Sequence, residues 1–133
     1  MLDPAEVAGW VRAFAFTQLV EVPLYTAALG WAALRPPQER GPARPALPVS
    51  FRIAVAFLCS LLSHPVVWFG FPRLIDPYDH YTAMVVAAEA FAVGSEAIVL
   101  WSVRLRFALP ISFLVNMASL WLGLLLRQLT GWI

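Results

Sequence analysis

Residues 15–25 read Ala15-Phe-Thr-Gln-Leu-Val-Glu-Val-Pro-Leu-Tyr25, an apolar run that also contains a carboxylate, a proline and a tyrosine. An acidic side chain in the hydrocarbon core of a bilayer costs about 2.5–3.5 kcal/mol on insertion scales unless it is protonated or has a partner. A second acid, Glu96, lies in a similar apolar run. Both acids therefore need partners, and the rest of the chain has to supply them.

The composition predicts a membrane protein. Of the 133 residues, 61% are hydrophobic and 13% are charged, whereas about a quarter of the residues of a soluble domain are charged. The apolar residues fall into four runs, each near or above the roughly 20 residues that cross a bilayer as a helix. The predicted spans cover residues 9–34, 50–71, 77–103 and 108–127, and a proline-rich linker covers residues 35–49.

The predicted fold class is all-α, a polytopic membrane protein whose four transmembrane helices form two tandem hairpins. Four spans and their connections use almost the whole chain, so we expect one transmembrane domain over residues 1–133. The third span should begin at Asp76-Pro77-Tyr78-Asp79, which combines an N-cap, a proline at N1 and an acid at N3. Capping explains both aspartates, so we expect no metal site and no cofactor.

The two predicted hairpins resemble each other in sequence. Ala15-Phe16-xxxx-Glu21 aligns with Ala90-Phe91-xxxx-Glu96, and Phe57-Leu58-x-Ser60-xx-Ser63 aligns with Phe113-Leu114-x-Asn116-xx-Ser119. These matches predict an internal repeat. Because the first and third spans point the same way, the pseudo-twofold axis would run along the membrane normal, which makes the repeat parallel.

The repeat predicts a polar cluster near the midplane of the membrane. Glu21 and Glu96 should lie at equal depth, with Ser60 and Asn116 beside them. Two carboxylates that face each other in a low dielectric cannot both be ionised cheaply, so the pair should share a proton. The further candidates for buried polar or ion-binding side chains are Glu89, His64 and Tyr25.

The third span also carries a row of small residues with a 4-3-4-3 spacing, which would let another helix approach closely. This predicted helix-packing seam consists of Ala83, Ala87, Ala90, Gly94 and Ala97. It lies about 130° round the helix from Glu89 and Glu96, at about 100° per residue. The seam predicts a homo-oligomer or a contact with a membrane-protein partner, in addition to the lipid bilayer.

The arginines predict the orientation of the chain. All nine basic residues are arginine, and they form no basic stripe, so nucleic acid is not an expected partner. Six of them lie in residues 35–52 and 104–106, and three lie on the opposite side of the predicted membrane. The positive-inside rule then places both termini outside the cytoplasm.

Three functions fit these residues, and the sequence favours a protein that is not an enzyme. The first is proton- or cation-linked binding or transport at the glutamates. The second is a non-catalytic accessory subunit of a larger membrane assembly, which docks through the seam. The third is an intramembrane hydrolase in which a glutamate and His64 activate a water and Asn116 is the oxyanion donor. This third arrangement resembles the glutamate-type proteases of the CAAX-protease kind in residue types only, because the chain lacks their EExxxR motif.

The pattern Glu21-x-Pro23-x-Tyr25, Ser63-His64-Pro65-xx-Trp68, Glu96 and Asn116 resembles small uncharacterised four-span membrane proteins of prokaryotes. The resemblance covers most of the chain through short motifs. It implies a multi-pass protein of the inner, cytoplasmic membrane, and it brings no known activity with it.

Overall fold

A computed structural model of the chain describes residues 3–31 and 47–131. Residues 35–46 of the predicted proline-rich linker lie outside this described part. The described residues form helices and short connections: α1 (Pro4–Trp31), α2 (Val49–Pro65), the π-helix η3 (Val66–Gly70), α3 (Phe71–Leu74), α4 (Pro77–Ser102) and α5 (Ala108–Thr130). Because α2, η3 and α3 continue as one rod from Val49 to Leu74, four long helices result.

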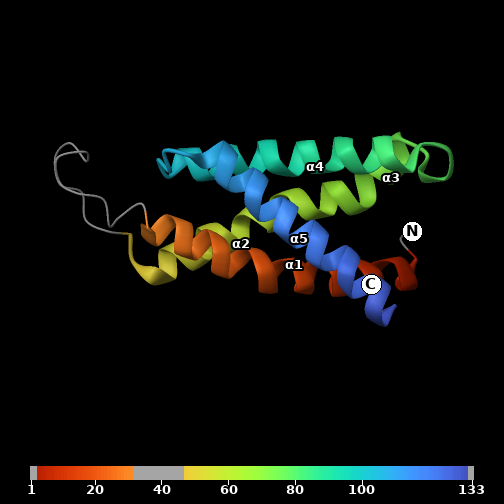
Figure 1. Cartoon of the computed structure of the whole chain (residues 1–133), viewed down its shortest axis with the longest axis horizontal. Coiled ribbons are helices and arrows are strands. Elements are labelled where there is room, and N and C mark those ends of the chain that lie inside the picture. The colour runs from red at the N-terminus through yellow and green to blue at the C-terminus, as the bar shows by residue number, and fades with distance from the viewer. Residues whose placement is uncertain (1–2, 32–46, 132–133) are drawn as a thin grey trace.

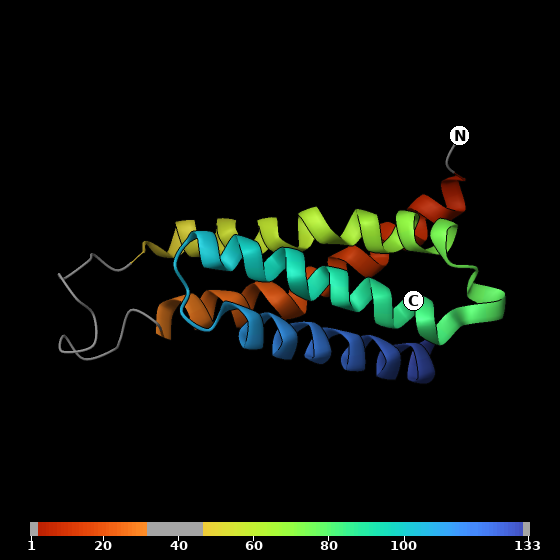
Figure 2. The ribbon, with the colours of Figure 1, turned by 90° about the horizontal axis from the view of Figure 1, so that it is seen from above.

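The four long helices form a bundle in which each packs against two others. Helix α1 packs against α2 and α5, and α4 packs against the same two helices. Figures 1 and 2 show that the start of α1 and the end of α5 lie at one end of the bundle, together with the α3–α4 connection. The turn between α4 and α5 lies at the opposite end. We call these the terminal end and the turn end.

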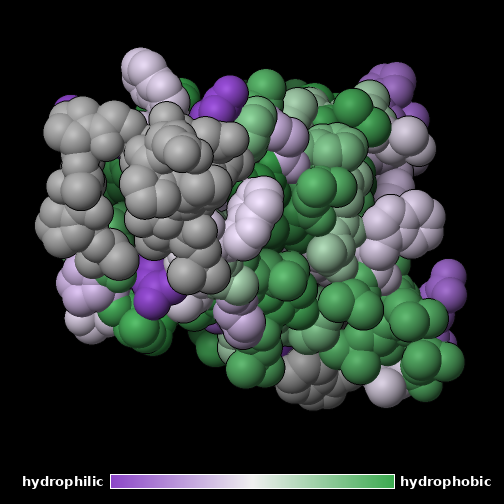
Figure 3. Space-filling view, turned by 60° about the vertical axis from the view of Figure 1, so that its left-hand side comes forward, coloured by the Kyte–Doolittle hydropathy of each residue, from purple (hydrophilic) through white to green (hydrophobic). Residues whose placement is uncertain are grey.

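Three of the helical segments are long and apolar enough to cross a membrane, namely Val49–Leu74, Pro77–Ser102 and Ala108–Thr130. Helix α1, with 28 residues that include Glu21, is not one of them. Large apolar side chains lie on the outside of the bundle, and the space-filling view shows a broad apolar surface (Figure 3). An apolar exterior of this extent is unusual for a soluble monomer, so the chain is a membrane protein.

The buried interior differs between the two ends of the bundle. The turn end is filled by an apolar cluster to which all four long helices contribute, and whose largest members are Tyr25, Leu29, Leu100 and Leu105. The buried polar side chains begin directly beside Tyr25 and continue toward the terminal end. This division places the polar side chains between a closed apolar end and the end that carries the termini.

Local sequence signals determine where α4 begins and where α5 ends. The backbone N–H of Tyr78 donates to Asp76 Oδ1 at 2.9 Å, so Asp76 is the N-cap of α4 and the helix begins at Pro77. Helix α5 runs three residues beyond the predicted end, to Thr130, because Gly131 supplies the left-handed C-cap with a φ of 62°.

Candidate functional site

The candidate site is a cluster of polar side chains in the middle of the bundle. Within the described residues, the buried polar and charged side chains are Glu21, Ser60, Ser63, Glu96, Ser112 and Asn116. They come from all four long helices. Tyr25, which is fully buried, and Ser119, which is partly buried, complete the hydrogen-bond network.

The carboxyl group of Glu96 accepts hydrogen bonds from the three other long helices. Tyr25 of α1 donates to Oε2 at 2.5 Å, and Asn116 of α5 donates to the same oxygen at 2.8 Å. Ser63 of α2 donates to Oε1 at 2.6 Å. Since Glu96 itself belongs to α4, this single carboxyl group connects the whole bundle.

The carboxyl group of Glu21 accepts two hydroxyl donors. Ser60 of α2 donates to Oε2 and Ser119 of α5 donates to Oε1, both at 2.5 Å. The side chain of Glu21 is 1% exposed, as is that of Glu96. The two acids are therefore equally buried, and each is held by donors from both α2 and α5.

Two of the serines have a second acceptor within their own helix. Ser63 Oγ lies 3.3 Å from the carbonyl oxygen of Cys59, and Ser119 Oγ lies 3.1 Å from that of Asn116. When a carboxyl group carries a proton, the neighbouring hydroxyl can accept that proton's hydrogen bond and donate to the carbonyl instead. The network can thus take up and release a proton without leaving a buried polar group unpaired.

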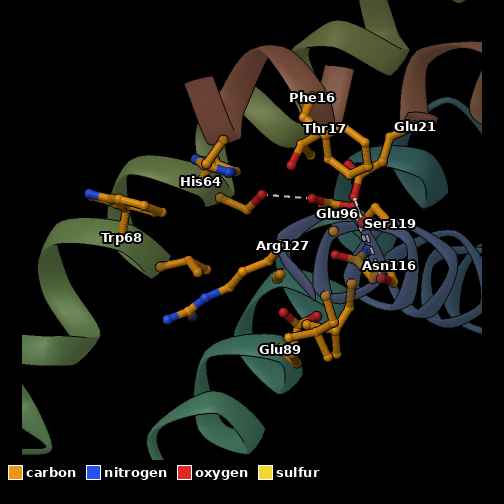
Figure 4. Close-up of a pocket in the computed structure, with 17 residues that line it drawn as sticks. Phe16, Thr17, Glu21, His64, Trp68, Glu89, Glu96, Asn116, Ser119 and Arg127 are labelled. Carbon is orange, nitrogen blue, oxygen red and sulfur yellow. Dashed lines mark hydrogen bonds between the residues drawn. The ribbon is translucent and has the colours of Figure 1, made fainter. Parts of the chain in front are cut away.

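A cavity of about 450 Å³ leads from these carboxyl groups toward the terminal end of the bundle. Its inner part is formed by Glu21, Glu96, Ser63, Asn116 and Ser119. The other lining residues are mainly apolar or aromatic: Ala13, Phe16, Thr17, His64, Val67, Trp68, Glu89, Ala92, Leu120, Gly123, Leu124 and Arg127. Figure 4 shows Glu21, Glu96, Asn116 and Ser119 gathered together, with His64 and Trp68 on the other side of the view.

His64 and Trp68 lie at an irregularity in the rod Val49–Leu74. Pro65 has no backbone N–H to donate, and the helix continues through the π turn Val66–Gly70, which carries Trp68. π turns inside α-helices occur frequently at functional sites. The two rings stack with an interplanar angle of 11° and form part of the cavity wall.

The predicted candidates divide into two groups. Glu21, Glu96, Asn116, Ser60 and Tyr25 meet in the hydrogen-bond network. Glu89 and His64 line the cavity without joining the network. His64 packs against the rings of Trp10, Phe14 and Trp68, and its buried Nδ1 has no hydrogen-bond partner among the described residues. Among the described residues, His64 therefore makes no direct hydrogen bond to a glutamate through Nδ1.

The sequence did not identify Ser63, Ser112 or Ser119 as members of the site. Ser63 and Ser119 donate to the glutamates, and Ser112 donates to the carbonyl oxygen of Val93 at 2.9 Å. Ser63 and Ser119 occupy corresponding positions in the aligned second and fourth spans, so the alignment contained a signal for this pair.

The small-residue seam of α4 does not face the interior of the bundle. Ala83 and Ala90 are exposed, and a Cβ atom added to Gly94 would meet no described atom within 4 Å. The helix instead packs through Ala88, Ala92 and Ala97, of which only Ala97 belongs to the seam. The seam's role in contacts with other chains stays a prediction.

No protein-family model, curated protein or solved structure matches the chain.

The network predicts that Tyr25 contributes to stability through its hydroxyl. Tyr25→Phe removes the donor at Glu96 and should lower the free energy of unfolding by about 0.6–1.7 kcal/mol, the average and the largest values for hydrogen bonds between membrane helices. Tyr81→Phe is the matched control, since Tyr81 is 51% exposed. Equilibrium unfolding in detergent micelles measures both variants.

A double-mutant cycle makes this prediction specific. The loss of unfolding free energy caused by Tyr25→Phe should be smaller in a Glu96→Gln background and unchanged in a Glu21→Gln background. The reason is that Tyr25 donates to Glu96 and not to Glu21. Equal effects in both backgrounds would contradict the observed pairing.

Proposed function

We propose that this membrane protein binds protons, or another cation in exchange for them, at Glu21 and Glu96 and moves them across the bilayer. The observation that carries the proposal is the pair of buried carboxyl groups at the inner end of a cavity, each with a serine that has a second acceptor. Such a site can change its protonation state while its hydrogen bonds remain satisfied.

Energetics support a functional role for the two acids over a purely structural one. Burying two comparable acids costs about 5–7 kcal/mol on insertion scales. The five hydrogen bonds that they accept return about 3 kcal/mol at the average value for membrane helices. Stability alone therefore gives no reason to keep both carboxyl groups.

The location of the cavity supports transport as well as binding. It reaches from the carboxyl groups to the exposed Arg127 at the terminal end, whereas the apolar cluster fills the turn end. A site that is accessible from one side and closed on the other corresponds to one state of a transporter with alternating access. In the other state, the packing around Tyr25, Leu29 and Leu100 has to open.

We further propose that α1 is the fourth span and that the two hairpins are parallel repeats. Four of the five hydrogen bonds to the carboxyl groups support this, because exchanging Glu21, Ser60 and Ser63 for Glu96, Asn116 and Ser119 turns each of the four into another observed one. The fifth, from Tyr25 to Glu96, has no counterpart at Glu21 among the described residues. The contacts of α1 with α2 and α5 likewise become those of α4 with α5 and α2. With 28 residues, α1 is about 42 Å long, which is sufficient to cross a bilayer.

The same proposal makes the chain one transmembrane domain of a prokaryotic inner membrane, with both termini outside the cytoplasm. The distribution of the arginines supports this orientation. Figure 1 shows that α1 starts and α5 ends at the same end of the bundle, which supports placing both on the same side of the membrane.

Proton flux tests the proposed function. Proteoliposomes with an internal pH dye should show flux that depends on the protein when a diffusion potential is imposed. Glu21→Gln and Glu96→Gln should each abolish this flux, because an amide cannot exchange the proton. Asp79→Asn, which removes an exposed acid outside the cavity, should leave it unchanged. Undiminished flux through folded glutamine variants would refute the proposal.

Cysteine labelling tests the fourth span and the orientation. The sequence has one cysteine, Cys59, which is buried and can be replaced by alanine. In spheroplasts, a membrane-impermeant maleimide should label Asp3→Cys at once and Arg106→Cys only after lysis. Labelling of both positions from the same side would contradict α1 as a span, and the reversed pattern would contradict the orientation.

The second candidate function is an accessory subunit of a larger assembly or a homo-oligomer. The observation that favours it is the open row of Ala83, Ala90 and Gly94 on α4, since small residues on a membrane helix allow close approach of another helix. Gly94→Leu should then remove the partner, or the second copy, that co-purifies with the native protein. Thr82→Leu, about 120° away on an exposed part of α4, is the matched control. A native protein that runs as a monomer without partner would exclude this function.

A further inference from the structure

We propose that the cation exchanged for protons at Glu21 and Glu96 is organic: a protonated or quaternary amine attached to an apolar, preferably aromatic, body. This inference rests on the proposed function and names its substrate class. It follows from the size of the cavity, the chemistry of its walls, the free acceptor capacity of the carboxyl groups and the charges that face it.

The size of the cavity favours a molecule over a single ion. A volume of about 450 Å³ lies within the range of about 300–1,000 Å³ that is typical of small-molecule sites. A proton relay or one dehydrated metal ion needs only a fraction of this space. The remaining volume lies between the carboxyl groups and the terminal end of the bundle.

The walls favour an apolar body. Much of the wall carries no side-chain oxygen, as at Phe16, Val67, Leu120 and Leu124. Outside the inner polar part of the cavity, Thr17 is the one lining residue with a hydroxyl group. An inorganic cation that leaves its water shell needs several oxygen ligands at close range. Within the described residues, no three histidine, cysteine, aspartate or glutamate side chains are grouped as a metal site. An organic cation loses less hydration and gains from burying its hydrocarbon part.

Two of the three aromatic side chains that line the cavity lie on one wall, and the third, Phe16, belongs to α1. His64 and Trp68 belong to the rod Val49–Leu74. In the alignment that pairs Ser60 with Asn116, His64 corresponds to Leu120 of α5 and Trp68 corresponds to Leu124. Indole is the most favourable ring for a cation–π contact. The wall formed by α2 and η3 thus suits an aromatic or cationic group, whereas the wall formed by α5 suits an aliphatic one.

The carboxyl groups retain acceptor capacity for a cation. Each oxygen of Glu21 accepts one hydroxyl donor, and so does Oε1 of Glu96. A carboxylate oxygen has two lone-pair directions, so three oxygens can each accept one more N–H. A primary ammonium can use them directly, and a quaternary ammonium is attracted without a hydrogen bond.

The charges that face the cavity favour a cation. Glu21, Glu96 and Glu89 line it, and they are opposed by Arg127 alone among its lining residues. Arg127 is exposed, so water and salt screen its charge, whereas Glu21 and Glu96 are almost completely buried. An anionic substrate would therefore meet repulsion at the inner end of the cavity.

The test uses benzyltrimethylammonium as the probe and neopentylbenzene, its neutral carbon isostere, as the control ligand. The protein is placed in weakly buffered nanodiscs, with empty nanodiscs to correct for partitioning into lipid. The ammonium compound should release protons and change the tryptophan fluorescence in a saturable manner, and the isostere should release none. Glu21→Gln and Glu96→Gln should each weaken the binding at least about thirtyfold, and Asp79→Asn should not change it.

A second variant fills the cavity and leaves the acids intact. A Cβ atom at Gly123 would lie 3.5 Å from Phe16 Cε1, an ordinary contact, so the backbone accepts a Cβ atom there. Gly123→Leu should then abolish the binding of benzyltrimethylammonium while proton flux in liposomes continues. This variant separates the substrate class from the proton site.

The outcomes distinguish the two proposals. Glutamate-dependent proton flux without any effect of benzyltrimethylammonium would overturn the organic-cation inference alone. The inference would also fail if sodium or potassium released the protons in place of the organic cation, or if the neutral isostere bound equally well. Absence of both proton flux and proton release would overturn the proposed function, and the inference with it.

Discussion

Two carboxyl groups in a low-dielectric interior are the constraint on which the rest of this structure depends. Glu21 and Glu96 are each only 1% exposed, so the solvent around the bundle does not satisfy their carboxyl oxygens. Donors must therefore come from the other helices, and Ser60, Ser63 and Asn116 supply three of them. Since each donor lies on a different helix from its acceptor, satisfying the acids also sets how the four helices pack.

The same constraint explains why the two ends of the bundle differ. Beyond Tyr25 the buried side chains are apolar and pack closely, which excludes water from one side of the acids. On the other side the side chains leave a cavity, and the carboxyl groups line its polar inner part. The hydroxyl of Tyr25 marks the boundary, because it donates to Glu96 while its ring packs in the apolar cluster.

Features that depend on residues close together in the sequence were predictable, whereas contacts that depend on how the two hairpins pack were not. The start of α4 was predictable because Asp76 caps a residue two positions away. The meeting of Glu21 with Ser60 was expected from the repeat and from the depth of both residues. The donation from Ser63 to Glu96 could not be predicted, because it depends on how α2 packs against a helix of the other hairpin. Small residues occur on two faces of α4, and composition alone did not tell that Ala88 and Ala92 would face inward.

The π turn Val66–Gly70 has an evolutionary meaning under the proposed repeat. A π turn accommodates one inserted residue within an α-helix without changing the direction in which the flanking residues point. The rod that contains α2 has this turn, whereas α5 is a regular helix from Ala108 to Thr130. If both descend from one duplicated hairpin, the copy with the π turn carries the stacked rings of His64 and Trp68, while Ser63, one helical turn earlier, donates to Glu96 as Ser119 of α5 donates to Glu21. Under the proposed repeat, the aromatic rings beside the cavity therefore distinguish the two hairpins, whereas a serine that donates to a glutamate is common to both.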